Sequence, residues 1–355
     1  MSTLTSHPST HFPAPADTTA PAPAEHRGVA RDAVRMLVAR SPRDIRHRVF
    51  RDLPDELEPG DLLVVNTSAT IPAQADATGD ALGRIVVHVA SRLDDGTYVV
   101  ELRTAPDARR AILDAAPGET VALDGATLTL VAPYPREHSS PTGVGNRLWR
   151  VSVSGDLSLA LGRVGRPIAY GYLDRRYPLA DYQTVFSIDP GSAEMPSAAR
   201  PFTTDLVTAL ISKGVGVSPI TLHTGVSSQE AGEAPQAERY AVPAVTAEAV
   251  NAAKARGGRV VAVGTTVTRA LESAVAADGL VRPSSGWTER VITPDDPVRV
   301  VDGLVTGWHD PEASHLMLVE SVAGRELTQA AYDAAIGAGY LWHEFGDSAL
   351  LLPVR

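Results

Sequence analysis

The 355-residue sequence contains no cysteine, and this absence excludes several kinds of protein. Without thiols the chain has no disulfide scaffold, no thiolate zinc site, no iron–sulfur cluster and no cysteine nucleophile. No run of about 18 apolar residues is present, so the sequence predicts no membrane-spanning helix. The N-terminus also lacks the basic and apolar regions of a signal peptide. We therefore expect a cytoplasmic protein.

Several common catalytic motifs are missing as well. The sequence contains no G-x-S-x-G, no P-loop and no G-x-G-x-x-G, and its histidines do not stand at metal-ligand spacing. We therefore expect no metal. What is present is the composition of an ordinary globular protein, with 44% hydrophobic and 21% charged residues, over a length that suits a large core and two domains.

Positive charge is concentrated in one stretch, although the formal net charge of the whole chain is −10. The negative total gives no general electrostatic reason to bind nucleic acid. Only two acids interrupt the arginines of this stretch, which are Arg27, Arg31, Arg35, Arg40, Arg43, Arg46, Arg48 and Arg51. The stretch is either a phosphate-binding patch or a solvated face whose arginines pair with acids elsewhere, and we favour the second interpretation.

Apolar periodicity and turn residues divide the chain into three parts. Residues 1–25 are rich in Pro, Ala, Thr and Ser without apolar periodicity, which predicts a disordered tail. Residues 74–153 alternate short strand patterns with turns, including a hairpin turn at Asp124-Gly125 and one helix over 108–115, which predicts an inserted β-barrel or sandwich. Residues 26–73 and 154–355 alternate helix and strand, which predicts a discontinuous α/β main domain with a partly parallel sheet.

Within the main domain the pattern predicts individual elements. Strands are expected over 36–39, 62–65, 217–223, 259–263, 298–301 and 304–306. Helices are expected over 203–213, 246–256, 267–276, 312–322 and 328–337, the first two capped by threonine and closed by glycine.

The clearest local feature is the turn Gly264-Thr265-Thr266 between a buried strand and a helix. Glycine permits a close approach of ligand, and the free N–H groups and dipole of the helix favour an anion such as a carboxylate or phosphate. Arg269, one turn further on, is placed to reinforce such a site. The alternative is an ordinary capped helix in which Arg269 pairs with Glu272, and on pattern alone we favour it.

Three further segments carry polar groups near predicted element ends. The loop containing Ser197 consists of small residues before a helix capped by Thr203 or Thr204, and is either a ligand loop or a linker. His223 ends a strand, at the sheet edge where ligands bind in α/β proteins, although a lone histidine is more often structural. His309 suits acid–base chemistry, and Asp310 either orients it or caps the next helix.

Taken in order, these segments resemble the S-adenosylmethionine:tRNA ribosyltransferase-isomerase family of queuosine biosynthesis. The resemblance extends from Arg31 to Leu351 and is weakest over residues 74–160. Its evidence is the order and spacing of short segments, among them Pro59-Gly60-Asp61-Leu62-Leu63-Val64, Ile71-Pro72-Ala73, Tyr182-Gln183-Thr184-Val185-Phe186, Thr221-Leu222-His223, Ala262-Val263-Gly264-Thr265-Thr266 and Leu316-Met317-Leu318.

The resemblance implies a fold and a reaction. The fold is an α/β (α+β) main domain with an inserted all-β, barrel-like domain. In the reaction, S-adenosylmethionine is the ribosyl donor and 7-aminomethyl-7-deazaguanine in a tRNA anticodon arm supplies the attacking amine. The ribosyl unit is transferred and isomerised to give epoxyqueuosine, with release of adenine and methionine. The sulfonium acidifies its neighbouring C–H, so that a base can start the chemistry without a metal.

Residue types and resemblance together define a candidate site. The candidate catalytic residues are His309, His223 and Glu238. Contacts to the donor are expected from Asn66, Ser197, Thr203, Gly264, Thr265, Thr266 and Arg269. The tRNA is expected to contact Arg43, Arg46 and Arg48, and the protein is expected to be a monomer.

Several pocket positions depart from the family's pattern. The family's Asn-Asp-Thr-Arg is 66–69 here and loses an acid and an arginine, while Pro201 and Gln236 replace two histidines. The segments 225–229 and 306–311 are altered too, although His309 and Glu238 are kept. Three hypotheses therefore stand: the family's reaction on tRNA, the same donor used on a non-tRNA acceptor, and a non-catalytic binding protein on the same scaffold.

Overall fold

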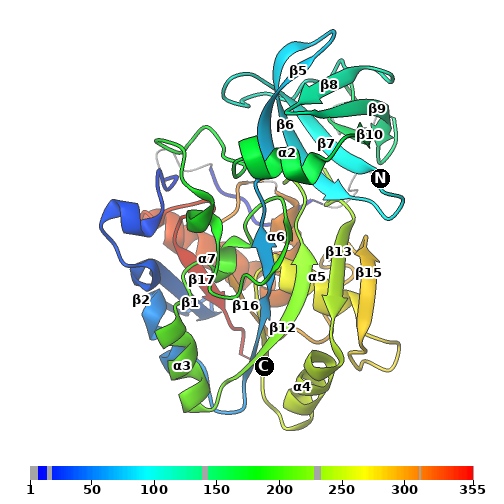
Figure 1. Cartoon of the computed structure of the whole chain (residues 1–355). Helices are drawn as coiled ribbons and strands as arrows, with labels where there is room; N and C mark the ends of the chain where they lie inside the picture. Colours follow the sequence, from blue (N-terminus) through cyan, green and yellow to red (C-terminus); the bar gives the residue numbers. More distant parts are fainter. Residues whose placement is uncertain (1–6, 14–17, 138–142, 228–232, 312, 355) are drawn as a thin grey trace.

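The computed structural model describes residues 7–13, 18–137, 143–227, 233–311 and 313–354. Its described part contains a nine-stranded sheet with helices packed on it and, beyond one end of the sheet, a closed barrel (Figure 1). The expected fold class, an α/β main domain with an inserted all-β barrel, is thereby confirmed. Among these residues no helix combines the length and apolarity that crossing a membrane requires.

The main sheet has the strand order β15-β13-β12-β3-β14-β16-β17-β1-β2. Strands β12, β3, β14 and β16 are parallel neighbours, as are β17 and β1, which confirms the partly parallel sheet. Their bounds are β1 (Arg35–Ser41), β2 (Asp44–Val49), β3 (Leu62–Asn66), β12 (Gly216–His223), β13 (Glu238–Val242), β14 (Val260–Val263), β15 (Ser284–Thr288), β16 (Gly303–Thr306) and β17 (Ser348–Leu351). A separate parallel pair joins β4 (Ser68–Thr70) to β11 (Asp189–Ser192).

Both faces of the main sheet are buried, because its central strands are apolar at nearly every position. In β3, Leu62 and Val64 belong to one core cluster and Leu63 and Val65 to the other. The first cluster packs against α4 (Ala244–Ala255), α5 (Thr265–Ser273), α6 (Ser314–Ala323) and α7 (Arg325–Gly337). The second packs against α1 (Leu53–Glu56) and α3 (Thr204–Lys213). A continuous apolar run is typical of such doubly covered strands.

Helix α3 begins and ends where the sequence predicts. The Thr203 hydroxyl accepts a hydrogen bond from the Leu206 N–H, and Gly214 closes the helix in the left-handed region at φ 92°. Helix α4 begins two residues earlier than expected, because Pro243 precedes its first turn and Thr246 is not the cap. The Thr246 hydroxyl instead donates to the carbonyl of Pro219.

The barrel has the closed strand order β10-β7-β6-β5-β8-β9, around a core of its own. Its strands are β5 (Gln74–Gly79), β6 (Gly83–Arg92), β7 (Tyr98–Thr104), β8 (Thr120–Leu123), β9 (Ala126–Tyr134) and β10 (Leu148–Ser154), followed by α2 (Leu157–Val164). Asp124 and Gly125 both have positive φ, which confirms the hairpin turn between β8 and β9. The domain boundaries at residues 74 and 153 stay predictions.

Two expected elements are wrong. Residues 108–115 form no helix, because their backbone pairs with strand β7 through the Ile112 N–H and the Leu102 carbonyl. Residues 298–301 form no strand, because the N–H groups of Val300 and Val301 donate to the Glu272 carboxylate rather than to a neighbouring strand. Short 3-10 turns complete the described structure at Ala24–Arg27, Arg31–Ala33, Phe50–Asp52, Leu179–Tyr182 and Ser197–Ala199.

The N-terminal segment contacts the body of the protein in its described parts, 7–13 and 18–25. Phe12 stacks on Tyr332 with ring centroids 4.8 Å apart, and the Thr10 N–H donates to the Glu320 carboxylate over 2.6 Å. The predicted disorder is therefore wrong for these residues, because distant side chains supply the order that local composition does not. Residues 1–6 and 14–17 of the predicted tail lie outside the described part of the chain.

Candidate active site

A cavity of about 610 Å³ lies at the carboxyl ends of the parallel strands. Thr224 follows β12, Gly264 follows β14 and Thr306 ends β16, and all three line the cavity. This edge is where ligands bind in open α/β sheets, because helix N-termini and strand-end loops converge there. The cavity therefore brings together residues from segments far apart in the sequence.

The turn from β14 into α5 forms one wall of the cavity. Gly264, Thr265 and Thr266 all line it, as the anion-site hypothesis requires. Gly264 has φ 98°, and a Cβ at this position would lie 3.3 Å from the Ala198 Cβ, so both the backbone conformation and the close packing favour glycine. The first turn of a helix leaves N–H groups without intrahelical partners, and here that turn borders the cavity.

Arg269 does not pair with Glu272. It bonds instead to the beginning of strand β13 and to the residues just before that strand. Its Nη1 lies 2.6 Å from Glu238 Oε2, and its other N–H groups donate to the carbonyls of Gln236, Thr288 and Arg290. Burial raises the pKa of Glu238, and the charge of Arg269 opposes that rise. Arg269 is thus a positioning residue whose charge is already compensated by a carboxylate.

His309 lies in the cavity as a neutral imidazole. Its Nε2 is 3.1 Å from the Thr306 hydroxyl, and its ring stacks on His315 with centroids 4.8 Å apart. Burial and the neighbouring His315 and His343 lower its pKa well below the ordinary value, so the ring is uncharged at neutral pH. Asp310 is not the partner of His309 in the structure, because its carboxylate lies 3.8 Å from His343 Nε2.

Three of the residues expected in the site have structural contacts away from the cavity lining. The Asn66 side chain accepts from two backbone N–H groups and donates to the Leu222 carbonyl, joining β3 to β12. His223 Nδ1 lies 2.7 Å from the Ser68 hydroxyl and against Gly191. Thr203 caps α3. Ser197, by contrast, lines the cavity as expected.

Sequence reasoning did not identify a second part of the cavity wall, which contains Tyr170, Tyr172, Glu194 and Glu344. Tyr170 donates to Glu194 and Tyr172 donates to Glu344, and the two tyrosine rings lie 6.2 Å apart. Burial and the Glu194 charge raise the pKa of Glu344 to about 8. These residues have no periodicity and no motif spacing, so only the tertiary structure brings them together.

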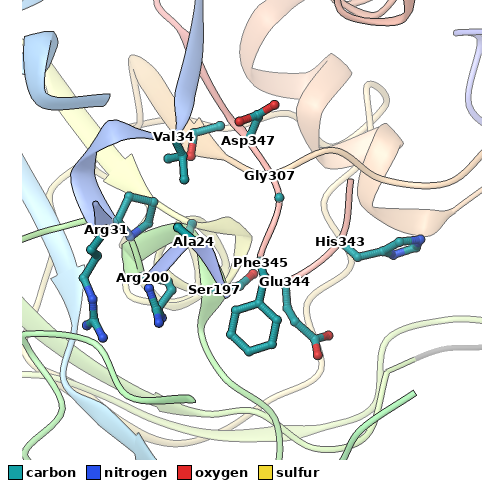
Figure 2. A pocket seen from close by; sticks show the side chains of 14 residues that line it. Ala24, Arg31, Val34, Ser197, Arg200, Gly307, His343, Glu344, Phe345 and Asp347 are labelled. Atoms are coloured by element: carbon teal, nitrogen blue, oxygen red, sulfur yellow. The ribbon is translucent and has the colours of Figure 1, made fainter. Parts of the chain in front are cut away.

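A smaller pocket adjoins the cavity and shares Ser197, Ala198, Gly307, His343 and Glu344 with it (Figure 2). In Figure 2 the side chains of His343 and Glu344 point in different directions from adjacent positions of one loop. Arg200 lines this pocket, with its guanidinium 2.9 Å from a Glu25 oxygen. Pro201, at the position of a family histidine, lines the smaller pocket and not the large cavity.

The arginine-rich stretch is mostly paired within the protein, as the second interpretation of that charge run expects. Arg46 pairs with Asp44, and Arg48 and Arg40 both pair with Glu56. Strand β1 is parallel to β17, and β17 is antiparallel to β16, so the hairpin turn at Arg43 lies at the sheet edge opposite the cavity. Contact of this turn with tRNA stays a prediction.

Comparison with known proteins identifies relatives over nearly the whole chain. The model of the queuosine biosynthesis protein family matches residues 8–351. An S-adenosylmethionine:tRNA ribosyltransferase-isomerase of Acidiphilium cryptum is 40% identical over 337 residues, covering 90% of this chain and 93% of that protein. An enzyme of the same name from Thermus thermophilus is 38% identical over 333 residues, covering 91% of this chain and 93% of that protein.

A solved structure agrees with these relatives. The crystal structure of an S-adenosylmethionine tRNA ribosyltransferase from Thermotoga maritima superposes with a TM-score of 0.52 at 27% identity, covering 96% of this chain and 99% of that one. The match of the family model over nearly the full length, together with the identity to the two enzymes, is decisive. The chain belongs to the queuosine biosynthesis protein family.

Proposed function

We propose that this protein is an S-adenosylmethionine:tRNA ribosyltransferase-isomerase, which transfers and isomerises the ribosyl unit of S-adenosylmethionine onto 7-aminomethyl-7-deazaguanine in tRNA. The observation that supports it is the full-length similarity to enzymes of that name, combined with a 610 Å³ cavity at the strand edge where α/β enzymes bind ligands. S-adenosylmethionine is a co-substrate in this function, and the tRNA is the acceptor.

The donor's methionine carboxylate fits the N-terminus of α5. The backbone N–H groups of Thr265 and Thr266 and the helix dipole favour an anion there, and Gly264, whose own N–H donates to the Val305 carbonyl, permits its close approach. Arg269 does not supply this charge, because it is bonded to Glu238. Its role in the proposal is to fix Gln236 and Glu238 at the cavity wall.

His309 is the proposed base for the donor's acidified C–H. An imidazole with a lowered pKa is unprotonated at neutral pH and so has a free lone pair. The Thr306 hydroxyl, 3.1 Å from Nε2, orients the ring. The amine of the acceptor then attacks the ribosyl unit, which is isomerised to the epoxycyclopentanediol while adenine and methionine leave. Glu238 stays a second candidate catalytic residue.

The finer parts of the proposal concern the partner and the setting of the reaction. The acceptor is the anticodon arm of a tRNA, which Arg43, Arg46 and Arg48 are proposed to contact. The enzyme acts as a cytoplasmic monomer. Strong dependence of tRNA binding on salt would support a role for these arginines, because each phosphate contact releases a counterion.

One observation favours a second function, namely the use of the same donor on a non-tRNA acceptor. The two arginines that line the cavity, Arg269 and Arg290, are both paired with carboxylates, so the described cavity wall offers no free arginine to a phosphate backbone. A small amine acceptor needs no such cation. A non-catalytic binding protein is the third hypothesis and is excluded by any turnover that depends on His309.

Incubation of the purified protein with S-adenosylmethionine and tRNA that carries 7-aminomethyl-7-deazaguanine tests these functions, with adenine and methionine as the measured products. Release of both only in the presence of tRNA supports the first function. Release with 7-aminomethyl-7-deazaguanine as free base but not with tRNA supports the second. If the protein neither binds S-adenosylmethionine nor releases adenine under either condition, the proposed function is wrong.

A further inference from the structure

The second wall of the cavity carries two carboxylates that hydroxyl groups, rather than cations, contact. Tyr170 and Ser227 donate to Glu194, and Tyr172 donates to Glu344. Both carboxylates line the cavity. Among the described residues, no lysine or arginine forms an ion pair with either of them. This wall therefore differs from that of Glu238, whose charge Arg269 compensates.

No uncompensated arginine faces the cavity from its described lining. Arg290, the second arginine there, lies 3.0 Å from Asp296. The histidines of the lining are uncharged at neutral pH, because burial lowers the pKa of His309, His315 and His343. The cavity lining thus has more potential negative than positive charge.

One oxygen of this wall also lacks a hydrogen-bond donor. Glu344 Oε1 is buried and has no partner, whereas Tyr172 donates to Oε2 of the same carboxyl group. A buried acceptor without a donor is unfavourable unless a ligand supplies one. Burial raises the pKa of Glu344 to about 8, and a cation bound beside it stabilises the ionised carboxylate, whose oxygens both accept hydrogen bonds.

We propose that Glu194 and Glu344 form a binding site for a primary ammonium group of the substrate. Such a group has three N–H donors and one positive charge, which match the unpartnered oxygen and the uncompensated carboxylates of this wall. A phosphate or carboxylate at the same place would be repelled, and a sulfonium has no N–H to donate. Tyr170 and Tyr172 fix the two carboxylates so that little side-chain freedom is lost on binding.

The proposal rests on the proposed function for the identity of the ammonium. Two sources have this chemistry, the α-ammonium of the donor's methionine moiety and the aminomethyl group of the deazaguanine acceptor. Two matched pairs of probes distinguish them. The first is S-adenosylhomocysteine and its analogue with hydrogen in place of the amino group. The second is 7-aminomethyl-7-deazaguanine and 7-methyl-7-deazaguanine.

Titration calorimetry on the full chain with these four ligands tests the site. In the wild type, the ammonium-bearing member of one pair is expected to bind at least about tenfold more tightly than its partner. In a Glu194→Gln/Glu344→Gln double variant this preference disappears, while the ligand without the ammonium binds as before. Glutamine is nearly isosteric with glutamate, so the fold is retained. The pair that responds identifies the source of the ammonium.

Glu248→Gln, an exposed position on α4, is the matched control and keeps the preference unchanged. If the double variant still binds the ammonium-bearing ligand more tightly than its partner, the ammonium site is wrong. It is also wrong if the wild type shows no such preference in either pair. If adenine is still released from S-adenosylmethionine with tRNA, the proposed function survives that result. A wild type that binds none of the four ligands and releases no adenine overturns both.

Discussion

The carboxylates on the two walls of the cavity have different partners, an arginine on one wall and hydroxyl groups on the other. On one wall Glu238 is bonded to Arg269, at 2.6 Å, within a network that includes three backbone carbonyls. On the other, Glu194 and Glu344 are bonded to tyrosine hydroxyls. On the first wall Arg269 balances the charge of Glu238 without a ligand. On the second wall the charges of the carboxylates are balanced when a cation binds. One cavity therefore offers a preformed scaffold beside a site for positive charge.

The largest expected effect is on catalysis, through the cavity residue His309. His309→Ala should lower the rate of adenine release by about 10²- to 10⁴-fold, the usual contribution of a general base. Donor affinity should change little, which is measured by calorimetry. His309→Gln, which can still bond to Thr306, should lose the same activity because it is not basic. Full activity in either variant would show that His309 is not the base.

Arg269→Ala should produce the largest loss of stability. Removing the guanidinium leaves Glu238 buried without its cation, which typically costs about 3–5 kcal/mol of unfolding free energy. Denaturant unfolding measures the loss. Arg282→Ala, which breaks the exposed pair with Asp278, is the control and should cost less than about 1 kcal/mol. Equal losses in the two variants would contradict the distinction between a buried and a surface pair.

Glu344, on the second wall, should change how the stability of the protein depends on pH. The pKa of Glu344 is about 8 in the folded protein against 4.5 for the ordinary carboxyl group, so the unfolded chain loses this proton first. Glu344 therefore lowers the free energy of unfolding progressively as the pH rises from about 4.5 to 8. Above pH 8 this loss of stability stays constant. Glu344→Gln removes the contribution, so the variant should become more stable than the wild type by a few kcal/mol over this window.

Unfolding free energies of both proteins at several pH values measure this difference. Other groups near Glu344 are Tyr170, Tyr172, Tyr182, Glu194 and His343, and all are present in both proteins. Their contributions therefore largely cancel in the comparison. A difference that does not change between about pH 5 and pH 8 would mean that Glu344 is ionised throughout.

The smallest expected effect is on stability and concerns Thr203, which caps α3 and does not line the cavity. Thr203→Ala should lower stability by about 1 kcal/mol through loss of the α3 cap, while leaving the affinity for S-adenosylmethionine unchanged. Thermal unfolding and calorimetry measure the two quantities. Thr204→Ala, at the next and exposed position, should change neither by a comparable amount. Weaker donor binding by the Thr203 variant would place that residue in the site after all.

The class of fold and the part of the cavity wall at Gly264 could be predicted from the amino-acid sequence. Strong local signals were sufficient for this: apolar runs for the buried strands, Thr203 and Gly214 for the ends of α3, and Asp124-Gly125 for the hairpin. The turn at Gly264 was likewise readable, because strand, glycine and helix are contiguous. Family resemblance added His309 and Glu238, which both line the cavity.

Which polar groups face the cavity depends on long-range packing and could not be predicted from the sequence. Asn66 and His223 stood at strand ends, where ligands bind, yet their side chains bond to neighbouring strands and loops instead. Tyr172 and Glu344 are separated by 172 positions and meet only because the chain returns to the same edge of the sheet. Hydrogen bonding and burial depend on which residues are neighbours in three dimensions. Spacing along the sequence does not predict these neighbours when they are more than a hundred positions apart.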